Sequence, residues 1–381
     1  MKAVYIHIPY CVRKCLYCDF VSGPPDGPVF PFTEALETEL REGSLAFDDP
    51  EPVTSVFFGG GTPTFLSAEK LSRLLETVRE CFPVSQNAEI SLECNPGTLS
   101  FDGAAVLKEA GFNRVSIGLQ SSDNRLLKLL GRIHTKEEFL KAFYSLREAG
   151  FDNINVDVMH ALPEQSTKDY LDTLSFVCAL GPEHISSYSL ILEEGTPFYA
   201  MVSRGELSLP DEDMAADMQD EGIRFLNAKG FKRYEISNFA KEGHECRHNL
   251  LYWNNGLYLG FGPVAHSSYV INGKHVRWHN TNDRNEYIRR IKAGLSVHEE
   301  KTVIREEEQR FETVMLGLRK TEGIDAAMFK KRFGLSVGEA FPKATEYIKK
   351  NGLLGCSNEH SYALNSRGLD ILNSVLLQFM E

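Results

Sequence analysis

Short β-like runs alternate with helical patterns through the first half of the chain, and this alternation constrains the fold more than any other feature. The runs rich in β-branched and apolar residues cover 4–8, 55–58, 89–93, 114–119, 154–158 and 184–191. The helical patterns between them cover 68–81, 101–110, 136–149 and 168–180. Repeated βα units with right-handed crossovers build a parallel sheet. The pattern predicts an α/β fold, a partial (β/α)6 barrel whose site lies at the carboxyl ends of the strands.

The pattern changes after residue 192, where an acidic helical stretch at 211–230 leads into a strand-like run at 232–237. From residue 304 onwards the pattern is mainly helical, with one turn and strand at 355–364. This order predicts a small, mostly helical, winged-helix-like unit, which we expect to serve as a packing or lid domain because it has no obvious basic recognition helix. The predicted parts are a barrel with its extension at 1–240, a connecting segment at 241–300 and a C-terminal domain at 301–381.

Three cysteines follow directly on the first β-like run, in the string YCVRKCLYCDF. Thiolates are soft ligands, and Cys11, Cys15 and Cys18 are close enough in sequence to hold one 4Fe–4S cluster with an open fourth iron. A zinc site would need a fourth ligand, for which His7 is a candidate on the preceding strand. Three reduced structural cysteines are the remaining alternative. The spacing favours the iron-sulfur cluster.

Composition limits the class of protein. The net charge of −12 over 381 residues argues against a general nucleic-acid binder, which needs a basic face. The other five of the eight cysteines show no disulfide-like spacing, which indicates a reducing compartment. No apolar run approaches membrane-spanning length, and the N-terminus has no signal-peptide pattern. We therefore expect a cytoplasmic protein that does not bind nucleic acid.

A glycine run, Gly59-Gly60-Gly61-Thr62, stands at the end of the second β-like run. Glycines there let a ligand approach the backbone closely and free N–H groups to bind it. The run is not a phosphate loop, because no Gly-Lys-Ser/Thr follows. A tight βα turn without a ligand is the alternative.

Polar residues also end the next strand-like runs. Glu93, Gln120 and Asp157 fall at the ends of the third, fourth and fifth runs. Because the carboxyl ends of parallel strands meet on one face, these side chains are expected to share a pocket and to hold hydroxyl and charged groups of a cofactor. Arg132, in LGRIH, offers a positive partner for a carboxylate. Each residue alone would more often be an ordinary capping or solvated group.

Another candidate site lies in the segment RHNLLYW. If this segment is helical, His248 and Tyr252 lie on one face, four residues apart, with Trp253 beside them. An imidazole can ligate haem iron, and aromatic rings offer a flat surface to a macrocycle. The alternative is a hydrogen-bonded histidine packed among aromatics.

The CxxxCxxC spacing with an aromatic before the third cysteine resembles the radical S-adenosylmethionine (SAM) superfamily, and the wider string YIHIPYCVRKCLYCDF resembles its coproporphyrinogen oxidase-like subfamily. The resemblance covers nearly the whole chain. It implies that the methionine end of SAM chelates the fourth iron and that Gly60, Gly61 and Thr62 lie against its amino end. It further implies that Tyr5 contacts the cofactor and that Tyr17 sits beside its adenine.

Two departures separate the chain from the oxygen-independent oxidase of this subfamily. The oxidase has CxxxCxxCxC, whereas Phe20 occupies the fourth position here, and it carries a long N-terminal arm before its cluster. The HNxxYW motif, with His248, Tyr252 and Trp253, resembles the haem chaperone branch instead. We therefore expect a chaperone that binds a 4Fe–4S cluster, SAM and haem. The alternatives are a coproporphyrinogen III oxidase and, with less support, an RNA-modifying enzyme.

The partners expected from this resemblance are a haem-accepting client protein and a reductase or flavodoxin-type electron donor. The resemblance also allows a homodimer and peripheral membrane contact through the client. Whether SAM is cleaved, and so whether the protein acts as an enzyme, stays open.

Overall fold

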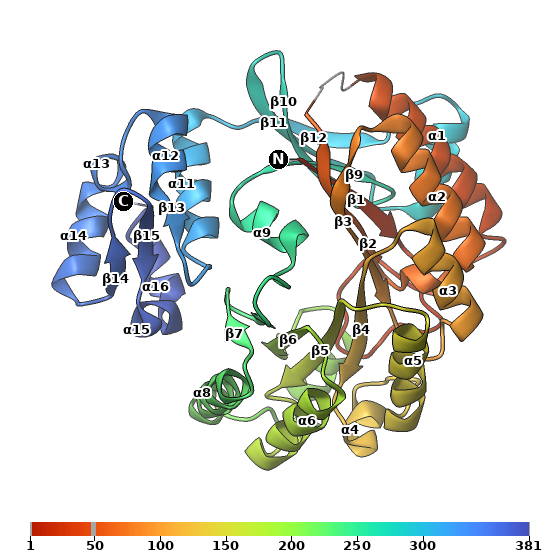
Figure 1. The fold of residues 1–381 in the computed structure, drawn as a ribbon, viewed down its shortest axis with the longest axis horizontal. Helices are drawn as coiled ribbons and strands as arrows, with labels where there is room; N and C mark the ends of the chain where they lie inside the picture. Colours follow the sequence, from red (N-terminus) through yellow and green to blue (C-terminus); the bar gives the residue numbers. More distant parts are fainter. Residues whose placement is uncertain (1, 47–50, 381) are drawn as a thin grey trace.

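A computed structural model of the chain describes residues 2–46 and 51–380, and its centre is a run of six parallel strands (Figure 1). The strands are β1 (Lys2–Ile8), β2 (Val53–Gly60), β3 (Val84–Cys94), β4 (Arg114–Gln120), β5 (Ile154–His160) and β6 (His184–Ser189). They neighbour one another in chain order, so their carboxyl ends lie along one edge. The predicted α/β fold with six βα units is confirmed.

Helices connect these strands and cover one face of the sheet (Figure 1). They are α1 (Phe30–Ala46), the 3-10 turn η1 (Pro63–Phe65), α2 (Ala68–Cys81), α3 (Phe101–Ala110), α4 (Asn124–Leu129), α5 (Lys136–Glu148) and α6 (Thr167–Leu180). The periodicity explains the packing of α2, because Leu71, Leu74, Leu75 and Val78 are all buried. Ser67 caps α2, and Gly111 ends α3 in the left-handed region at φ 101°.

The sheet extends beyond these six strands on both sides, which the sequence patterns did not indicate. On the β6 side, α7 (Pro197–Ser203) and α8 (Glu212–Ala228) lead to β7 (Lys232–Arg233) and β8 (Asn238–Ala240). On the β1 side lie β9 (Leu257–Phe261), β10 (His266–Ile271), β11 (Lys274–Asn280) and β12 (His298–Val303). Of the strand-like run at 232–237, only Lys232–Arg233 is a strand, which pairs antiparallel with β8 just beyond the run. The segment 241–300 contributes β9, β10, β11 and the start of β12 to the main sheet.

Two helices accompany these strands. The helix α10 (Arg284–Lys292) packs on α1. The short helix α9 (Arg247–Trp253) carries the HNxxYW residues, contacts β1 and β2, and lies between the sheet and the C-terminal helices (Figure 1). The helical form expected for this motif is confirmed.

The C-terminal part is a smaller, mostly helical unit with its own hydrophobic core, as predicted. Its helices are α11 (Glu306–Gly317), α12 (Ala326–Phe333), α13 (Val337–Ala340), α14 (Pro342–Lys350), α15 (Ser366–Asp370) and α16 (Leu372–Leu377). A three-stranded sheet of β13 (Ile324–Asp325), β15 (Ser361–Leu364) and β14 (Leu354–Ser357) completes it.

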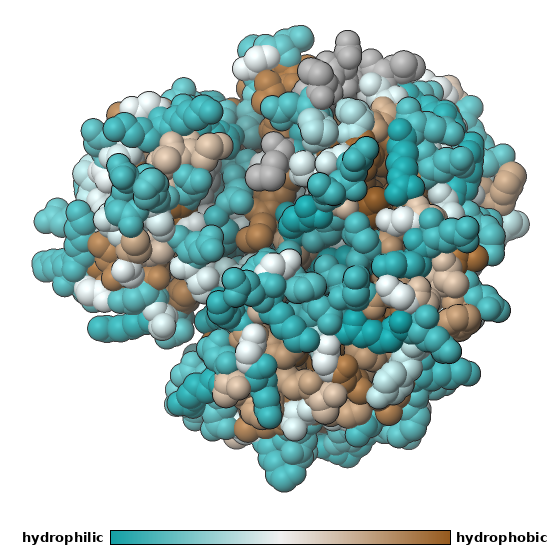
Figure 2. All heavy atoms as spheres, in the orientation of Figure 1, coloured by the Kyte–Doolittle hydropathy of each residue, from teal (hydrophilic) through white to brown (hydrophobic). Residues whose placement is uncertain are grey.

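The face of the molecule in Figure 2 is largely hydrophilic; hydrophobic residues gather in the lower part of the view, over β5, α6 and α5, and a smaller group lies between the C-terminal helices and the sheet. Within residues 2–46 and 51–380, no helix combines the length and the apolar character needed to cross a membrane.

Candidate functional site

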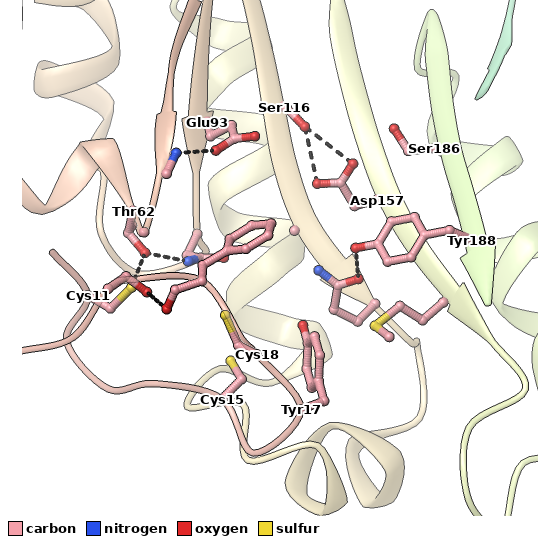
Figure 3. Close-up of a pocket in the computed structure, with 18 of the residues that line it drawn as sticks. Cys11, Cys15, Tyr17, Cys18, Thr62, Glu93, Ser116, Asp157, Ser186 and Tyr188 are labelled. Atoms are coloured by element: carbon pink, nitrogen blue, oxygen red, sulfur yellow. Dashed lines mark hydrogen bonds between the residues drawn. The ribbon is translucent and has the colours of Figure 1, made fainter. Parts of the chain in front are cut away.

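A cavity of about 590 Å³ opens at the carboxyl ends of β2 to β6, beside the loop that carries the three cysteines (Figure 3). Eleven of the fifteen residues predicted to bind the cluster, SAM or haem line it. They are Cys11, Cys15, Tyr17, Cys18, Gly60, Gly61, Thr62, Glu93, Gln120, Arg132 and Asp157. The parallel strands bring these residues together from six separate parts of the chain.

The cysteine loop follows β1 and turns its thiols toward the cavity (Figure 3). The Thr62 hydroxyl donates to Cys11 Sγ at 3.6 Å, and Arg132 Nη1 donates to Cys15 Sγ at 3.5 Å. Such donors compensate negative charge on sulfur. Burial raises the pKa of the Cys18 thiol above its ordinary value, an effect that a bound metal would offset by stabilising the thiolate.

Three soft donors in one partly buried, polar cavity suit an iron-sulfur cluster, because each thiolate would ligate a different iron and the three need not converge on one point. In the described part of the chain, no three His, Cys, Asp or Glu side chains converge closely enough for a single metal ion. The donor set therefore fits the cluster, with Cys11, Cys15 and Cys18 as the residues that would hold it.

The glycine run forms the floor between the cysteines and the strand ends. Gly60 has φ +118°, and its N–H donates to Glu93 Oε2 at 3.1 Å. A Cβ on Gly61 would lie 2.8 Å from Cys11 Sγ, so only glycine leaves room for the sulfur there. The N–H groups of Gly61 and Thr62 donate to the carbonyls of Ile8 and Tyr10, each at 2.8 Å, so the run packs its backbone against the start of the cysteine loop and leaves none of these N–H groups free for a ligand.

Two partly buried carboxyl groups face the cavity, Glu93 from β3 and Asp157 from β5, with β4 between the two strands. Burial, reinforced by the charge of Asp157, raises the pKa of Glu93 to about 8. Burial also raises the pKa of Asp157, against hydrogen bonds from Ser116 (3.1 Å) and Asn155 (2.7 Å) that lower it. Carboxyl groups held in this way can accept hydrogen bonds from ribose hydroxyls or neutralise a cationic ligand.

On the opposite wall, Arg132 donates to Asn95 Oδ1 at 2.6 Å and to the Gly118 carbonyl at 2.8 Å. These bonds hold the guanidinium next to Cys15 and supply the positive charge that a ligand carboxylate needs. Gln120 has φ +71°, and its Oε1 accepts from the Tyr188 hydroxyl at 3.1 Å. A non-glycine residue in the left-handed region at a strand end is the kind of local strain that collects at binding sites.

Several lining residues were missed by the sequence reasoning. They are Asn95, Arg114, Ser116, Asn155, Ser186, Tyr188 and Asn249. Three of them share a signal that was available, because they lie an even number of residues before a predicted one on the same strand and therefore point to the same face. Arg114 and Ser116 stand in this relation to Gln120 on β4, and Asn155 to Asp157 on β5.

Four predicted residues lie outside this cavity. Tyr5 and Tyr252 line a second cavity, on the other side of the cysteine loop, so the predicted contact between Tyr5 and SAM stays a prediction. Neither His248 nor Trp253 lines either cavity. The Trp253 indole has the Arg319 guanidinium over its ring, 5.8 Å from the centroid.

The His248 side chain is 1% exposed, and both of its ring nitrogens are hydrogen-bonded. Nδ1 pairs with the Ser55 hydroxyl at 3.0 Å and Nε2 with the Tyr252 hydroxyl at 3.0 Å. Its role as an axial haem ligand stays a prediction, and it would require at least one of these bonds to break. Burial lowers the pKa of His248 to about 3, so the ring is neutral.

A six-unit parallel sheet with a three-cysteine loop after its first strand and a polar cavity at its strand ends defines a radical SAM protein. The model of the radical SAM superfamily matches residues 5–177, and that of the HemN C-terminal domain matches residues 304–371. The chain is 37% identical to the heme chaperone HemW of Bacillus subtilis over 100% of this chain and 99% of that protein. It is 35% identical to HemW of Escherichia coli over 99% and 98%. The chain therefore belongs to the HemW family within the radical SAM superfamily.

Among solved structures, the fold is similar to coproporphyrinogen III oxidase (HemN) from Escherichia coli, described as a radical SAM enzyme. The TM-score is 0.84 at 22% sequence identity, over 99% of this chain and 89% of the oxidase. This likeness shows a common fold that includes the C-terminal unit.

Proposed function

We propose that this protein is a haem chaperone that binds a 4Fe–4S cluster and SAM, carries haem as cargo and transfers it to an acceptor protein. The observation that carries the proposal is similarity over the full length to proteins named heme chaperone HemW, at 37% and 35% identity. Phe20 at the position of the oxidase's fourth cysteine supports the chaperone over the oxidase.

In this proposal the first cavity is the cofactor site. Cys11, Cys15 and Cys18 hold the cluster, which supplies an open iron for the amino and carboxylate groups of SAM. The glycine run lets the amino-acid end of SAM approach the backbone closely, and Arg132 neutralises its carboxylate. Glu93, Gln120 and Asp157 hold the ribose, and Tyr17 lies beside the adenine.

The client protein and the electron donor are the partners of this proposal. A reductase or flavodoxin-type donor would reduce the cluster, and the acceptor would take haem from the chaperone. Homodimer formation and membrane contact through the client belong to the same proposal.

The cluster test uses the triple variant Cys11→Ala, Cys15→Ala, Cys18→Ala. Anaerobic reconstitution of the native protein should yield about four irons per chain with broad thiolate-to-iron absorption, and the triple variant should yield almost none. Cys356→Ala, far along the chain in the C-terminal hairpin, is the matched control and should keep the iron. Full iron content in the triple variant would contradict the assignment.

The SAM test follows the paramagnetic resonance spectrum of the reduced cluster. Adding SAM should perturb the spectrum of the native protein. The single variants Glu93→Ala and Asp157→Ala should weaken the perturbation, whereas the exposed Asp152→Ala should not. An unchanged response and affinity in both cavity variants would misplace the SAM pocket.

The functional test separates chaperone from oxidase. Haem should bind protein whose cluster has been removed, with a ligand-sensitive Soret band, and should pass to an apo-haemoprotein. Coproporphyrinogen III should not be decarboxylated at a useful rate. Efficient conversion to protoporphyrinogen IX with matching consumption of SAM would overturn the proposal in favour of the oxidase.

A further inference from the structure

The second cavity has a volume of about 750 Å³ and is larger than the cofactor cavity. Residues of β1, β9, β10 and β11 form one side of it, and Glu312, Met315 and Leu316 of α11 form the other. Its volume lies within the roughly 300–1,000 Å³ of ordinary ligand sites. The cavity therefore has room for a large ligand, and SAM does not occupy this space in the proposed function.

The walls of this cavity are mostly aromatic and aliphatic. Tyr252 and Tyr258 meet edge to face on the sheet side, with ring centroids 4.7 Å apart. Met315 and Leu316 contribute aliphatic surface on the helix side. Aromatic rings opposite flexible aliphatic chains suit a flat apolar macrocycle.

Asp19 and Phe20 line both cavities, so the end of the cysteine loop is their common wall. The Phe20 side chain is 59% exposed. Exposure of the Phe20 ring to water is unfavourable, and packing of the ring against an apolar ligand would bury this surface and stabilise the complex. Its position joins the second cavity to the cofactor site.

Three histidines lie close enough to this region to be compared as iron ligands, and only one is available. Both nitrogens of His248 are hydrogen-bonded. His7 also lines the cavity, but its Nδ1 pairs with the Tyr5 hydroxyl at 3.1 Å and its Nε2, although without a hydrogen-bond partner, is buried and not accessible to solvent. His266, at the start of β10, lines the cavity and is exposed, and neither ring nitrogen has a hydrogen-bond partner among the described residues.

The surroundings of His266 also keep its ring neutral. Partial burial lowers its pKa, and His279 and Arg277 lower it further, whereas Glu300 has the smaller opposite effect. The His279 ring lies 5.2 Å away, centroid to centroid. A neutral imidazole presents the lone pair that a metal needs.

Arg277, also on the cavity wall, provides a positive group for an anionic ligand. Its guanidinium forms a bidentate ion pair with the Glu312 carboxylate, with both N···O distances 2.8 Å. A ligand carboxylate could replace Glu312 in this pair, because a guanidinium recognises either carboxylate with the same geometry. Since Glu312 belongs to α11, such an exchange would loosen one tie between the sheet and the C-terminal unit.

We infer that haem lies in this second cavity, with its iron ligated by His266, its ring between Tyr258 and α11, and a propionate at Arg277. The inference rests on the proposed function and adds where the cargo binds. His248 is then a positioning residue, which holds Tyr252 on the cavity wall through their hydrogen bond.

The test compares haem binding by native protein, His266→Ala, His248→Ala and the exposed control His360→Ala. His266→Ala should shift the Soret band and weaken haem binding at least tenfold, and added imidazole should restore the native band by filling the vacated space. His248→Ala should keep the native ligation signature in resonance Raman spectra, with at most a weaker affinity. His360→Ala should behave as native protein.

A cavity-filling variant provides a check that does not depend on the ligand. Leu316→Trp should reduce haem binding while leaving the SAM-induced change of the cluster spectrum intact, because SAM occupies the other cavity. If native protein binds haem but His266→Ala and Leu316→Trp both bind it with an unchanged spectrum, the location is wrong and the chaperone function stands. Loss of the native ligation signature in His248→Ala alone would also overturn it. If native protein binds no haem, the proposed function itself fails.

Discussion

Replacing Glu89 with Gln should detach the N-terminus of α9 from the sheet. Glu89, on β3, is 4% exposed, and its carboxylate accepts hydrogen bonds from the backbone N–H groups of Arg247 (3.0 Å) and His248 (3.1 Å). These are the first two residues of α9, whose N-cap, Cys246, makes no side-chain capping bond to the backbone. The Glu89 carboxylate, from a strand far away in the sequence, therefore caps the N-terminus of α9.

Three losses contribute to the expected cost of Glu89→Gln. One of the two backbone N–H groups loses its acceptor in a buried setting, which costs about 1–3 kcal/mol. The negative charge at the helix N-terminus contributes up to about 2 kcal/mol. Arg114, which is 2% exposed, loses the favourable electrostatic interaction of its positive charge with the negative charge of Glu89. Because the losses overlap, we expect a total destabilisation of roughly 3–5 kcal/mol.

Urea unfolding of cluster-free, reduced protein, followed by circular dichroism, would measure this cost. Glu69→Gln is the matched control, because Glu69 lies in the first turn of α2 but is exposed. It should leave the unfolding midpoint close to that of the native protein. A loss below about 1 kcal/mol for Glu89→Gln, the size of an average substitution, would refute the anchoring argument.

Two further predictions concern pH and backbone geometry. Burial raises the pKa of Glu39 to about 7, while Tyr287 and two other groups donate hydrogen bonds to it. Because the folded pKa lies above the unfolded value of 4.5, its contribution to stability is fully present below pH 4.5 and is lost as pH rises through 7. Between pH 5 and pH 8, the free energy of unfolding of native protein should therefore fall by up to about 3 kcal/mol more than that of Glu39→Gln. Urea unfolding at the two pH values would measure the difference. Equal pH dependence would contradict this. Gly60→Ala should lower both melting temperature and reconstituted iron content, because a Cβ there would lie 2.7 Å from Cε1 of His7 at φ +118°. Gly27→Ala, where a Cβ meets nothing within 4 Å, should change neither, and equal behaviour of the two variants would remove the steric argument.

Local patterns predicted which residues meet at the cavity along the strand ends. Cys11, Cys15 and Cys18 lie close together in the sequence, so a single loop brings them to the same cavity. Glu93, Gln120 and Asp157 end successive β-like runs, and parallel strands bring such ends together whatever the details of packing. Neighbours at even spacing on the same strands, Ser116 before Gln120 and Asn155 before Asp157, follow from the same alternation.

The amino-acid sequence by itself therefore determined the βα order, the cysteine loop and the strand-end polar groups, because each depends on spacing within a short stretch. Tertiary structure alone decided that β9 to β12 join the same sheet, since short strands pair according to partners far along the chain. It also decided that His248 is enclosed by Ser55 and Tyr252, whereas His266 faces an open cavity. Which of two histidines is free to bind a metal depends on hydrogen bonds between distant residues, and no local pattern carries that information.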